Sequence, residues 1–226
     1  MKKKNKRIIG IIIAVVAIVI IGFIIYFHQK YDLPRWLRTR FSGEKAVVIL
    51  DAGHGGYDPG CGQEKPYEKE IAFNIVNKIQ KQLERLGYSV VLTRDDDTYV
   101  SLGDRVLKSR VYNGDLFVSI HLNWAENRQA RGIETYCNEE LNADSATLAK
   151  QLHKNVLLQT NATDRKVHKE SNYYVVCNSK VPSCLVEVGF LSSDKEGSLL
   201  KNDSYQEKIA DGITNGIFDY LEGKNK

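Results

Sequence analysis

The stretch AVVILDAGHGG, residues 46–56, places five apolar residues shortly before a glycine-rich turn that carries a histidine. A short, fully apolar run that is bounded by turn residues is typical of a strand buried on both faces. The glycines allow the backbone of the turn to approach other groups closely. The stretch therefore predicts a buried strand that ends in a turn presenting His54.

The segments after residue 56 alternate between helical and strand patterns. Apolar residues at helical spacing run from Ile71 to Leu86, and Gly87 ends that helix. Ser-x-x-Glu patterns at 193–196 and 204–207 predict the starts of the last helices. Further helices are expected at 102–112 and 145–160, and further strands at 89–92, 116–121, 132–137, 173–177 and 184–190.

Buried strands that alternate with helices are typical of a parallel sheet between two helical layers. The sequence therefore predicts an α/β fold with a mainly parallel, twisted sheet and helices on both faces. We expect this fold to form a single domain over residues 44–222, behind an N-terminal transmembrane helix.

Residues 8–27 form a run of twenty residues without a charge, preceded by the basic flank of residues 1–7. As a helix rising about 1.5 Å per residue, this run matches the roughly 30 Å hydrocarbon core of a bilayer. It exceeds the apolar region of about 7–15 residues in a secretory signal, and no A-x-A-like cleavage site follows it. We expect an uncleaved transmembrane helix, with a cleaved signal peptide as the alternative.

Residues 28–43 are expected to be a linker, with Pro34, Trp36 and three arginines that suit a membrane interface. Basic residues lie on both sides of the apolar run, so the orientation bias is slight. We expect the N-terminus inside and residues 44–222 on the extracytoplasmic side of the cell membrane, in a single-pass arrangement. Fully extended, the linker reaches only about 55 Å, so any substrate must lie close to the membrane.

Charge and cysteine content argue against several classes of protein. Nine of the 32 Lys and Arg residues, but only one of the 28 Asp and Glu residues, lie within residues 1–40, so the remainder has a net charge of −4. This is unlike the one-sided basic patch of a nucleic-acid-binding domain, and no nucleic acid partner is expected. No C-x-x-C pair suggests a zinc ribbon or a thioredoxin motif. The cysteines are Cys61, Cys137, Cys177 and Cys184.

Four titratable side chains are expected at the carboxyl end of the sheet. His54 follows the first strand, His121 closes the strand at 116–121, and Glu187 lies near the end of the strand at 184–190. Glu68 lies in the first turn of the first long helix and shares the inward face with Ile71. Ligands of such sheets bind outside the carboxyl ends of the strands, so we expect these four side chains to converge.

Two imidazoles and a carboxylate are a ligand set of catalytic zinc sites, which leave the fourth position for water. A second carboxylate beside that water can take its proton, so hydrolysis of a carbonyl substrate is expected. Non-haem iron uses the same set of ligands and stays open as an alternative. Cys61 is a weaker candidate ligand, and His28, His153 and His168 show no such placement.

Each of the four residues also has a structural interpretation. His54 can be a loop residue, and His121 can be a hydrogen-bonded core histidine. Glu68 can favour the helix N-terminus through the helix dipole. Glu187 is the hardest to explain in this way, because an unpaired carboxylate in a buried strand is costly.

The four residues lie in motifs that resemble those of the zinc-dependent N-acetylmuramoyl-L-alanine amidases of the amidase-3 type, which are bacterial cell-wall hydrolases. The resemblance runs from about Ala46 to Leu221. It departs from the family at Leu122 and Trp124, where small residues are usual, so the groove near the metal is expected to differ in shape. The motifs are DAGHGGYDPG (51–60), YEKEIAFNI (67–75), DLFVSIHLN (115–123) and CLVEVGFLSS (184–193).

The resemblance implies one zinc ion bound by His54, Glu68 and His121, with Glu187 as general base. It also implies a peptidoglycan substrate, cleaved at the amide between N-acetylmuramic acid and the L-alanine of the stem peptide. The short, membrane-anchored members act in wall remodelling, cell separation or sporulation, and an activating protein stays open. The alternatives are a catalytically silent peptidoglycan-binding module of the same fold and a metallohydrolase of another cell-wall amide.

Overall fold

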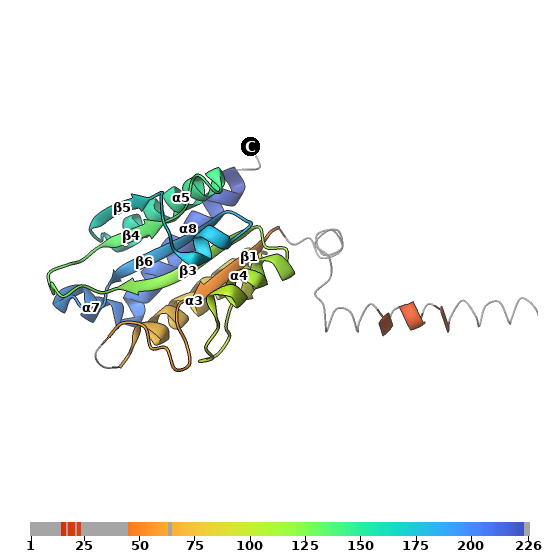
Figure 1. Cartoon of the computed structure of the whole chain (residues 1–226), viewed down its shortest axis with the longest axis horizontal. Helices are drawn as coiled ribbons and strands as arrows, with labels where there is room; N and C mark the ends of the chain where they lie inside the picture. The colour runs from red at the N-terminus through yellow and green to blue at the C-terminus, as the bar shows by residue number, and fades with distance from the viewer. Residues whose placement is uncertain (1–14, 17, 21, 24–44, 63–64, 224–226) are drawn as a thin grey trace, which may run out of the picture. The chain divides into compact units, whose positions relative to one another are not determined.

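The computed structural model describes residues 15–16, 18–20, 22–23, 45–62 and 65–223. Residues 44–226 form one compact unit, shown in Figure 1. Its elements in chain order are β1 (Val47–Ala52), α3 (Glu68–Arg85), β2 (Ser89–Leu92), α4 (Leu102–Val111), β3 (Leu116–Asn123), β4 (Ile133–Tyr136), α5 (Ala143–Thr160), β5 (Asp164–His168), α6 (Tyr174–Asn178), β6 (Ser183–Phe190), α7 (Asp194–Leu200) and α8 (Asp203–Gly223).

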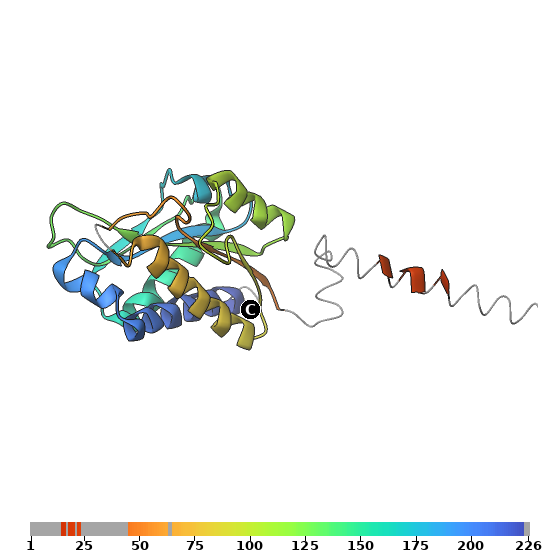
Figure 2. The same cartoon turned by 90° about the horizontal axis from the view of Figure 1, so that it is seen from below.

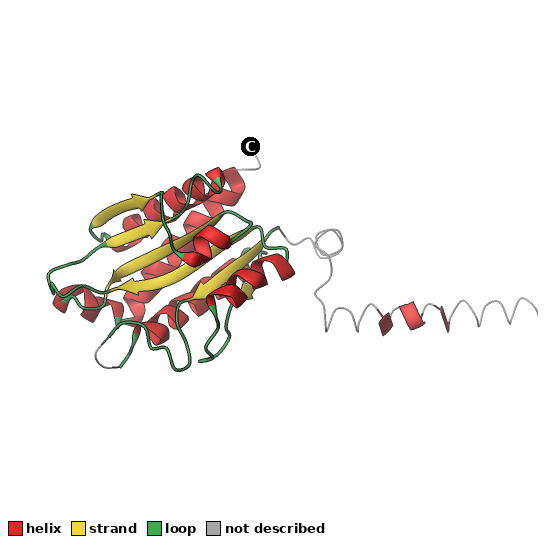
Figure 3. Ribbon diagram, viewed as in Figure 1, coloured by secondary structure: helices red, strands yellow, loops and turns green. Residues whose placement is uncertain are grey.

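The strands form one six-stranded sheet in the order β2-β1-β3-β6-β4-β5, seen in Figure 3. Every neighbouring pair is parallel except β4 and β6, which are antiparallel. The mainly parallel α/β sheet predicted from the sequence is therefore confirmed. The register pairs His121 of β3 with Glu187 of β6, so two of the predicted site residues lie on adjacent strands.

Helices cover both faces of the sheet. Figure 2 shows α3, α5 and α8 on one side of it and α4 and α6 on the other. Alternate residues of β1 supply the two apolar clusters, with Val48 and Leu50 in the larger one and Val47 and Ile49 in the smaller one. Both faces of this strand need apolar side chains, which explains why its sequence carries no polar residue before Asp51.

The strand predicted at 173–177 is wrong, because Tyr174–Asn178 is a short helix. Its neighbouring Val175 and Val176 are both buried, whereas Tyr173 and Tyr174 are exposed. Two adjacent buried residues fit one side of a helical turn, while a strand would point them to opposite faces. A five-residue apolar run cannot be assigned from its periodicity alone.

The structure contains one strand that was not predicted, and one of the two predicted helix caps is wrong. The exposed edge strand β5 has the sequence DRKVH, whose charged side chains form no apolar run that would predict a strand. Ser193 caps α7 as predicted, by accepting the backbone N–H of Glu196 at 3.4 Å. Ser204 is not a cap, since α8 begins at Asp203 and the Asn202 side chain accepts the N–H of Ser204 at 2.9 Å.

The predicted transmembrane segment, residues 8–27, lies mostly outside the described residues, as do the linker 28–43 and His28. Those residues between 15 and 23 that are described are helical and exposed. Within the part of the chain that the structure describes, we find no helix with the length and apolar character needed to cross a bilayer.

A buried ion pair joins α4 to β1. Arg105 Nη1 donates to Asp51 Oδ1 at 2.6 Å, and both side chains are almost fully buried. The hydroxyls of Thr93 and Ser119 also donate to the Asp51 carboxylate, at 2.5 and 2.6 Å. Burial by itself would raise the pKa of Asp51, but Arg105 and these two hydroxyls hold it below its ordinary value.

We expect Arg105→Leu to lower the free energy of unfolding by about 3–5 kcal/mol, because it leaves the Asp51 carboxylate buried and unpaired. The matched control is Arg128→Ala, which removes an exposed ion pair with Asp194 and is expected to cost about 0–1 kcal/mol. Urea denaturation of the two variants beside the wild type measures both values. Equal losses in the two variants would contradict the structural importance of the buried pair.

Candidate metal centre

The turn after β1 holds His54 in an uncommon backbone conformation. Its φ of 59° lies in the left-handed region, which residues other than glycine seldom adopt. Arg105 Nη2 donates to the carbonyl of His54 at 2.7 Å, and Arg94 donates to the carbonyls of Ala52 and Gly53, each at 3.0 Å. Two buried arginines therefore fix the turn that presents this imidazole.

Two glycines make room for the side chains of the site. A Cβ atom at Gly53 would overlap the imidazole of His121. A Cβ atom at Gly60 would lie 2.6 Å from both Glu68 Oε2 and His54 Cδ2. The DAGHGGYDPG sequence therefore needs glycine at these two positions to let the three side chains meet.

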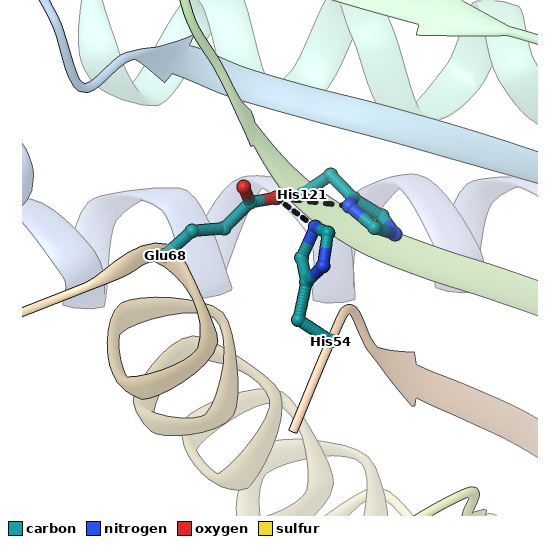
Figure 4. A group of neighbouring side chains, drawn as sticks. All are labelled: His54, Glu68 and His121. Atoms are coloured by element: carbon teal, nitrogen blue, oxygen red, sulfur yellow. Dashed lines mark hydrogen bonds and ion pairs between the residues drawn. The ribbon is translucent and has the colours of Figure 1, made fainter. Parts of the chain in front are cut away.

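Three of the predicted site residues, His54, Glu68 and His121, form one cluster, shown in Figure 4. Glu68 Oε1 lies 3.1 Å from His54 Nε2 and 2.9 Å from His121 Nδ1. One candidate ligand atom from each residue lies within 4.8 Å of the other two. The two imidazoles are 24% and 20% exposed, so the cluster is open to solvent on one side.

Neighbouring groups hold His54 Nδ1 and the Glu68 carboxylate. His54 Nδ1 contacts Asp58 Oδ2 at 2.8 Å, which leaves Nε2 directed at Glu68. The Glu68 carboxylate accepts the backbone N–H groups of Cys61 at 2.8 Å and Leu122 at 3.0 Å. A carboxylate behind a ligating histidine fixes its ring and raises its basicity. Asp58 is a site residue that was not predicted from the sequence, although its position four residues after His54 in the same turn indicates that the two side chains can meet.

The thiol of Cys61, the weaker candidate ligand, is hydrogen-bonded outside the cluster. Its thiol donates to the carbonyl of Leu122 at 3.2 Å. Among the described residues, the group able to hold a metal consists of His54, Glu68 and His121, without Cys61. The contribution of Cys61 to the site is its backbone N–H, which holds the Glu68 carboxylate.

Glu187 lies beside this cluster and differs from Glu68 in its hydrogen bonding. Its side chain is buried, and Oε2 has no hydrogen-bond partner within the described part of the chain. A buried polar atom without a partner is costly, so this oxygen fits a group that binds in the cavity. Burial raises the pKa of Glu187 to about 7, with the charge of His121 opposing the rise and that of Glu68 adding to it.

The pKa values of the cluster reflect strong mutual attraction. Burial alone would lower the pKa of His54, but hydrogen bonds and charge from Glu68 and Asp58 raise it to about 9. Burial would also lower the pKa of His121, but hydrogen bonding and charge from Glu68 raise it above its ordinary value. The pKa of Glu68 is well below its ordinary range despite burial, because both imidazoles hydrogen-bond to it. The two imidazoles bind protons tightly, and the three side chains suit a divalent cation once those protons leave.

The cluster and Glu187 line a single cavity of about 530 Å³. Its walls also include Tyr99, Leu122 and Trp124. Cavities of this size, with a few convergent polar groups and perturbed pKa values, are where ligands bind. Leu122 and Trp124, where the sequence departs from the family motif, therefore lie in the wall of this cavity.

Comparisons with known proteins identify the family. The model of the N-acetylmuramoyl-L-alanine amidase family matches residues 48–219. The chain is 35% identical over 175 residues to the N-acetylmuramoyl-L-alanine amidase LytC of Bacillus subtilis, which covers 77% of this chain and 35% of LytC. It therefore spans about a third of the length of that relative.

Two solved structures share the fold. The catalytic domain of the N-acetylmuramoyl-L-alanine amidase CwlV from Paenibacillus polymyxa aligns with a TM-score of 0.74 and 36% identity, over 78% of this chain and 98% of that one. The CwlD amidase of Clostridioides difficile, in complex with the GerS lipoprotein, aligns with a TM-score of 0.75 and 34% identity, over 79% and 99% of the two chains. Because the matched region extends from β1 into α8, the chain belongs to the N-acetylmuramoyl-L-alanine amidase family.

Proposed function

We propose that this amidase uses one zinc ion to hydrolyse the amide between N-acetylmuramic acid and the L-alanine of the peptidoglycan stem peptide. The observation that carries the proposal is the cluster of His54, Glu68 and His121 beside a Glu187 oxygen that has no hydrogen-bond partner among the described residues. Two imidazoles and one carboxylate fit zinc and leave a position free for water. Iron fits the same donor set, so metal analysis of the purified protein distinguishes the two ions.

In this proposal His54, Glu68 and His121 hold the ion, and Asp58 keeps the His54 ring in its ligating orientation. A bound zinc ion lowers the pKa of its water to about 7. Glu187 accepts the proton of the attacking water at its free carboxylate oxygen. It then gives that proton to the amine of L-alanine as the amide bond breaks. A pKa near neutrality suits a group that must both take and return a proton.

The alternative of a catalytically silent binding module is less well supported. Such a module would be expected to lack a ligand or the general base. Here each of the four side chains lines the same cavity. The buried Glu187 oxygen, which has no hydrogen-bond partner among the described residues, is costly to maintain, and the pKa of about 7 suits this carboxyl group to proton transfer.

We also propose that residues 8–27 anchor the protein in the cell membrane, with the amidase domain on the extracytoplasmic side. The support is the uncharged run of twenty residues and the peptidoglycan substrate, which lies outside the membrane. The similarity to CwlD, whose solved structure contains the GerS lipoprotein, supports a search for a protein partner on that side.

We expect His54→Ala and His121→Ala to lose bound zinc and activity together. Glu187→Gln is expected to keep the zinc and to lose about 10²–10⁴-fold in kcat, the contribution of a positioned general base. The measurements are metal content and release of stem peptides with a free L-alanine N-terminus from purified peptidoglycan, followed by mass spectrometry. His168→Gln, at an exposed histidine outside the cluster, is the control. Full activity of Glu187→Gln would rule out its role as base.

The zinc affinity is expected to rise with pH. His54, with its pKa raised to about 9, is protonated at pH 7, and a metal ion binds only the neutral imidazole. Each displaced proton makes the apparent affinity rise about tenfold per pH unit, up to about pH 9. Competition with a chelator between pH 6 and 9 measures the slope.

The Asp58→Asn variant tests the origin of this slope. It removes a charge that raises the pKa of His54, so its affinity should depend less steeply on pH between 7 and 9. The His168→Gln control should follow the wild type. An affinity that is independent of pH would contradict the proposed displacement of protons.

Membrane anchoring is tested by extraction and protease accessibility. The full-length protein is expected to stay with the membrane fraction after alkaline extraction, and its domain should be cleaved by protease added outside the cell. A variant without residues 1–43 should leave the membrane fraction. A mature protein that is released and starts beyond residue 27 would instead support the cleaved signal peptide.

A further inference from the structure

Tyr57 is unusual among the aromatic residues of the described chain. Its side chain is 80% exposed, the highest value among the exposed large apolar and aromatic side chains. Its ring stacks on that of Tyr99, with the ring centroids 4.4 Å apart and an angle of 24° between the planes. We call this pair the tyrosine stack. One face of Tyr57 is covered by Tyr99, so the exposed area lies on the other face.

The tyrosine stack rests on a rigid base. The backbone N–H of Gly56 donates to Asp97 at 3.0 Å, and Lys69 bridges the Gly56 carbonyl and the Asp97 carboxylate at 2.8 and 2.7 Å. A Cβ atom at Gly56 would lie 2.7 Å from the backbone nitrogen of Tyr99. The loop that carries Tyr57 and the loop that carries Tyr99 are therefore in close contact. An aromatic surface that is held in place before binding loses little entropy when a ligand arrives.

The tyrosine stack also lies beside the metal centre. Tyr57 directly precedes Asp58, whose carboxylate contacts His54 at 2.8 Å. Tyr99 lines the same cavity as His54 and Glu187. The stack therefore forms part of the rim of the cavity in which the amide is cleaved.

We propose that the tyrosine stack binds the glycan strand of the substrate, a proposal that rests on the function proposed above. The carbonyl that is attacked belongs to the lactyl group of the sugar, so a sugar ring must lie next to the metal centre. A pyranose ring has a face of C–H groups and a rim of hydroxyls, which match the apolar face and polar edge of tyrosine.

The charges around the tyrosine stack favour a neutral sugar over the acidic stem peptide. Lys69, the cation that links the two loops, is already paired with Asp97. Lys69 and Asp97 offset each other in charge, and Asp58 adds a further carboxylate beside the stack, so a ligand that carries carboxylates gains no attraction there. The exposed face of Tyr57 contributes little to the core, so it is available to a ligand.

The test measures binding of peptide-free glycan strands of alternating N-acetylglucosamine and N-acetylmuramic acid, in which the lactyl carboxylates left by removal of the stem peptides are converted to neutral amides. We expect Tyr57→Ala and Tyr99→Ala each to raise the Kd of the full chain for these strands by about tenfold. Tyr57→Phe keeps the ring and should bind within about twofold of the wild type. Phe218→Ala, at a 37% exposed aromatic side chain of α8, is the matched control and should bind like the wild type.

The outcomes separate this inference from the proposed function. Binding of peptide-free glycan needs no turnover, so it is measured with a chelator present as well as with zinc. Loss of binding in Tyr57→Ala and Tyr99→Ala, with retention in Tyr57→Phe and Phe218→Ala, supports the inference even if no hydrolysis is seen. Wild-type affinity in Tyr57→Ala, an equal loss for free stem peptide, or no glycan binding by the wild type would each overturn it.

Discussion

The buried ion pair between Asp51 and Arg105 is the interaction on which both the fold and the site depend. Asp51 lies at the end of β1 and also accepts hydrogen bonds from Thr93 and from Ser119 of β3. Arg105 comes from α4 and also donates to the carbonyl of His54. Burying two charges is favourable only when further hydrogen bonds satisfy them, and here they do. The same contacts that close one end of the sheet therefore hold the first candidate ligand in its left-handed conformation.

The two carboxylates of the cavity differ in their surroundings, and this difference supports the different roles proposed for them. Glu68 accepts two backbone N–H groups and contacts two imidazoles, and its pKa is lowered. Glu187 is also buried but keeps an oxygen without a partner in the described structure, and its pKa is raised. A carboxylate that stays ionised suits a metal ligand, whereas one poised near neutrality suits proton transfer. Geometry and charge thus support the same division of roles as the sequence motifs.

The parts of the structure that could be predicted are those in which the side chains follow a recognisable pattern of apolar and titratable residues. The apolar run at 46–50 identifies β1, and the positions of His54, His121 and Glu187 at strand ends predict their convergence. β5 is held by backbone pairing at an exposed edge, so its side chains gave no periodic signal. Arg105 acts through a contact with His54, 51 residues away in the sequence, and a single sequence does not reveal which distant polar residues meet. Asp58 is different, because it lies four residues after His54 in the same turn, where its position is a usable signal.

The groups around the cavity fall into two kinds according to what the fold requires of them. Arg94 and Arg105 are buried and bind backbone carbonyls, so the fold requires them as much as the site does. The exposed ring of Tyr57 is different, because a side chain that is 80% exposed contributes little burial to the stability of the domain. The loops beneath it are nevertheless joined closely by Lys69 and Asp97. An exposed ring on closely joined loops is what the proposed recognition of a ligand beside the candidate metal centre requires.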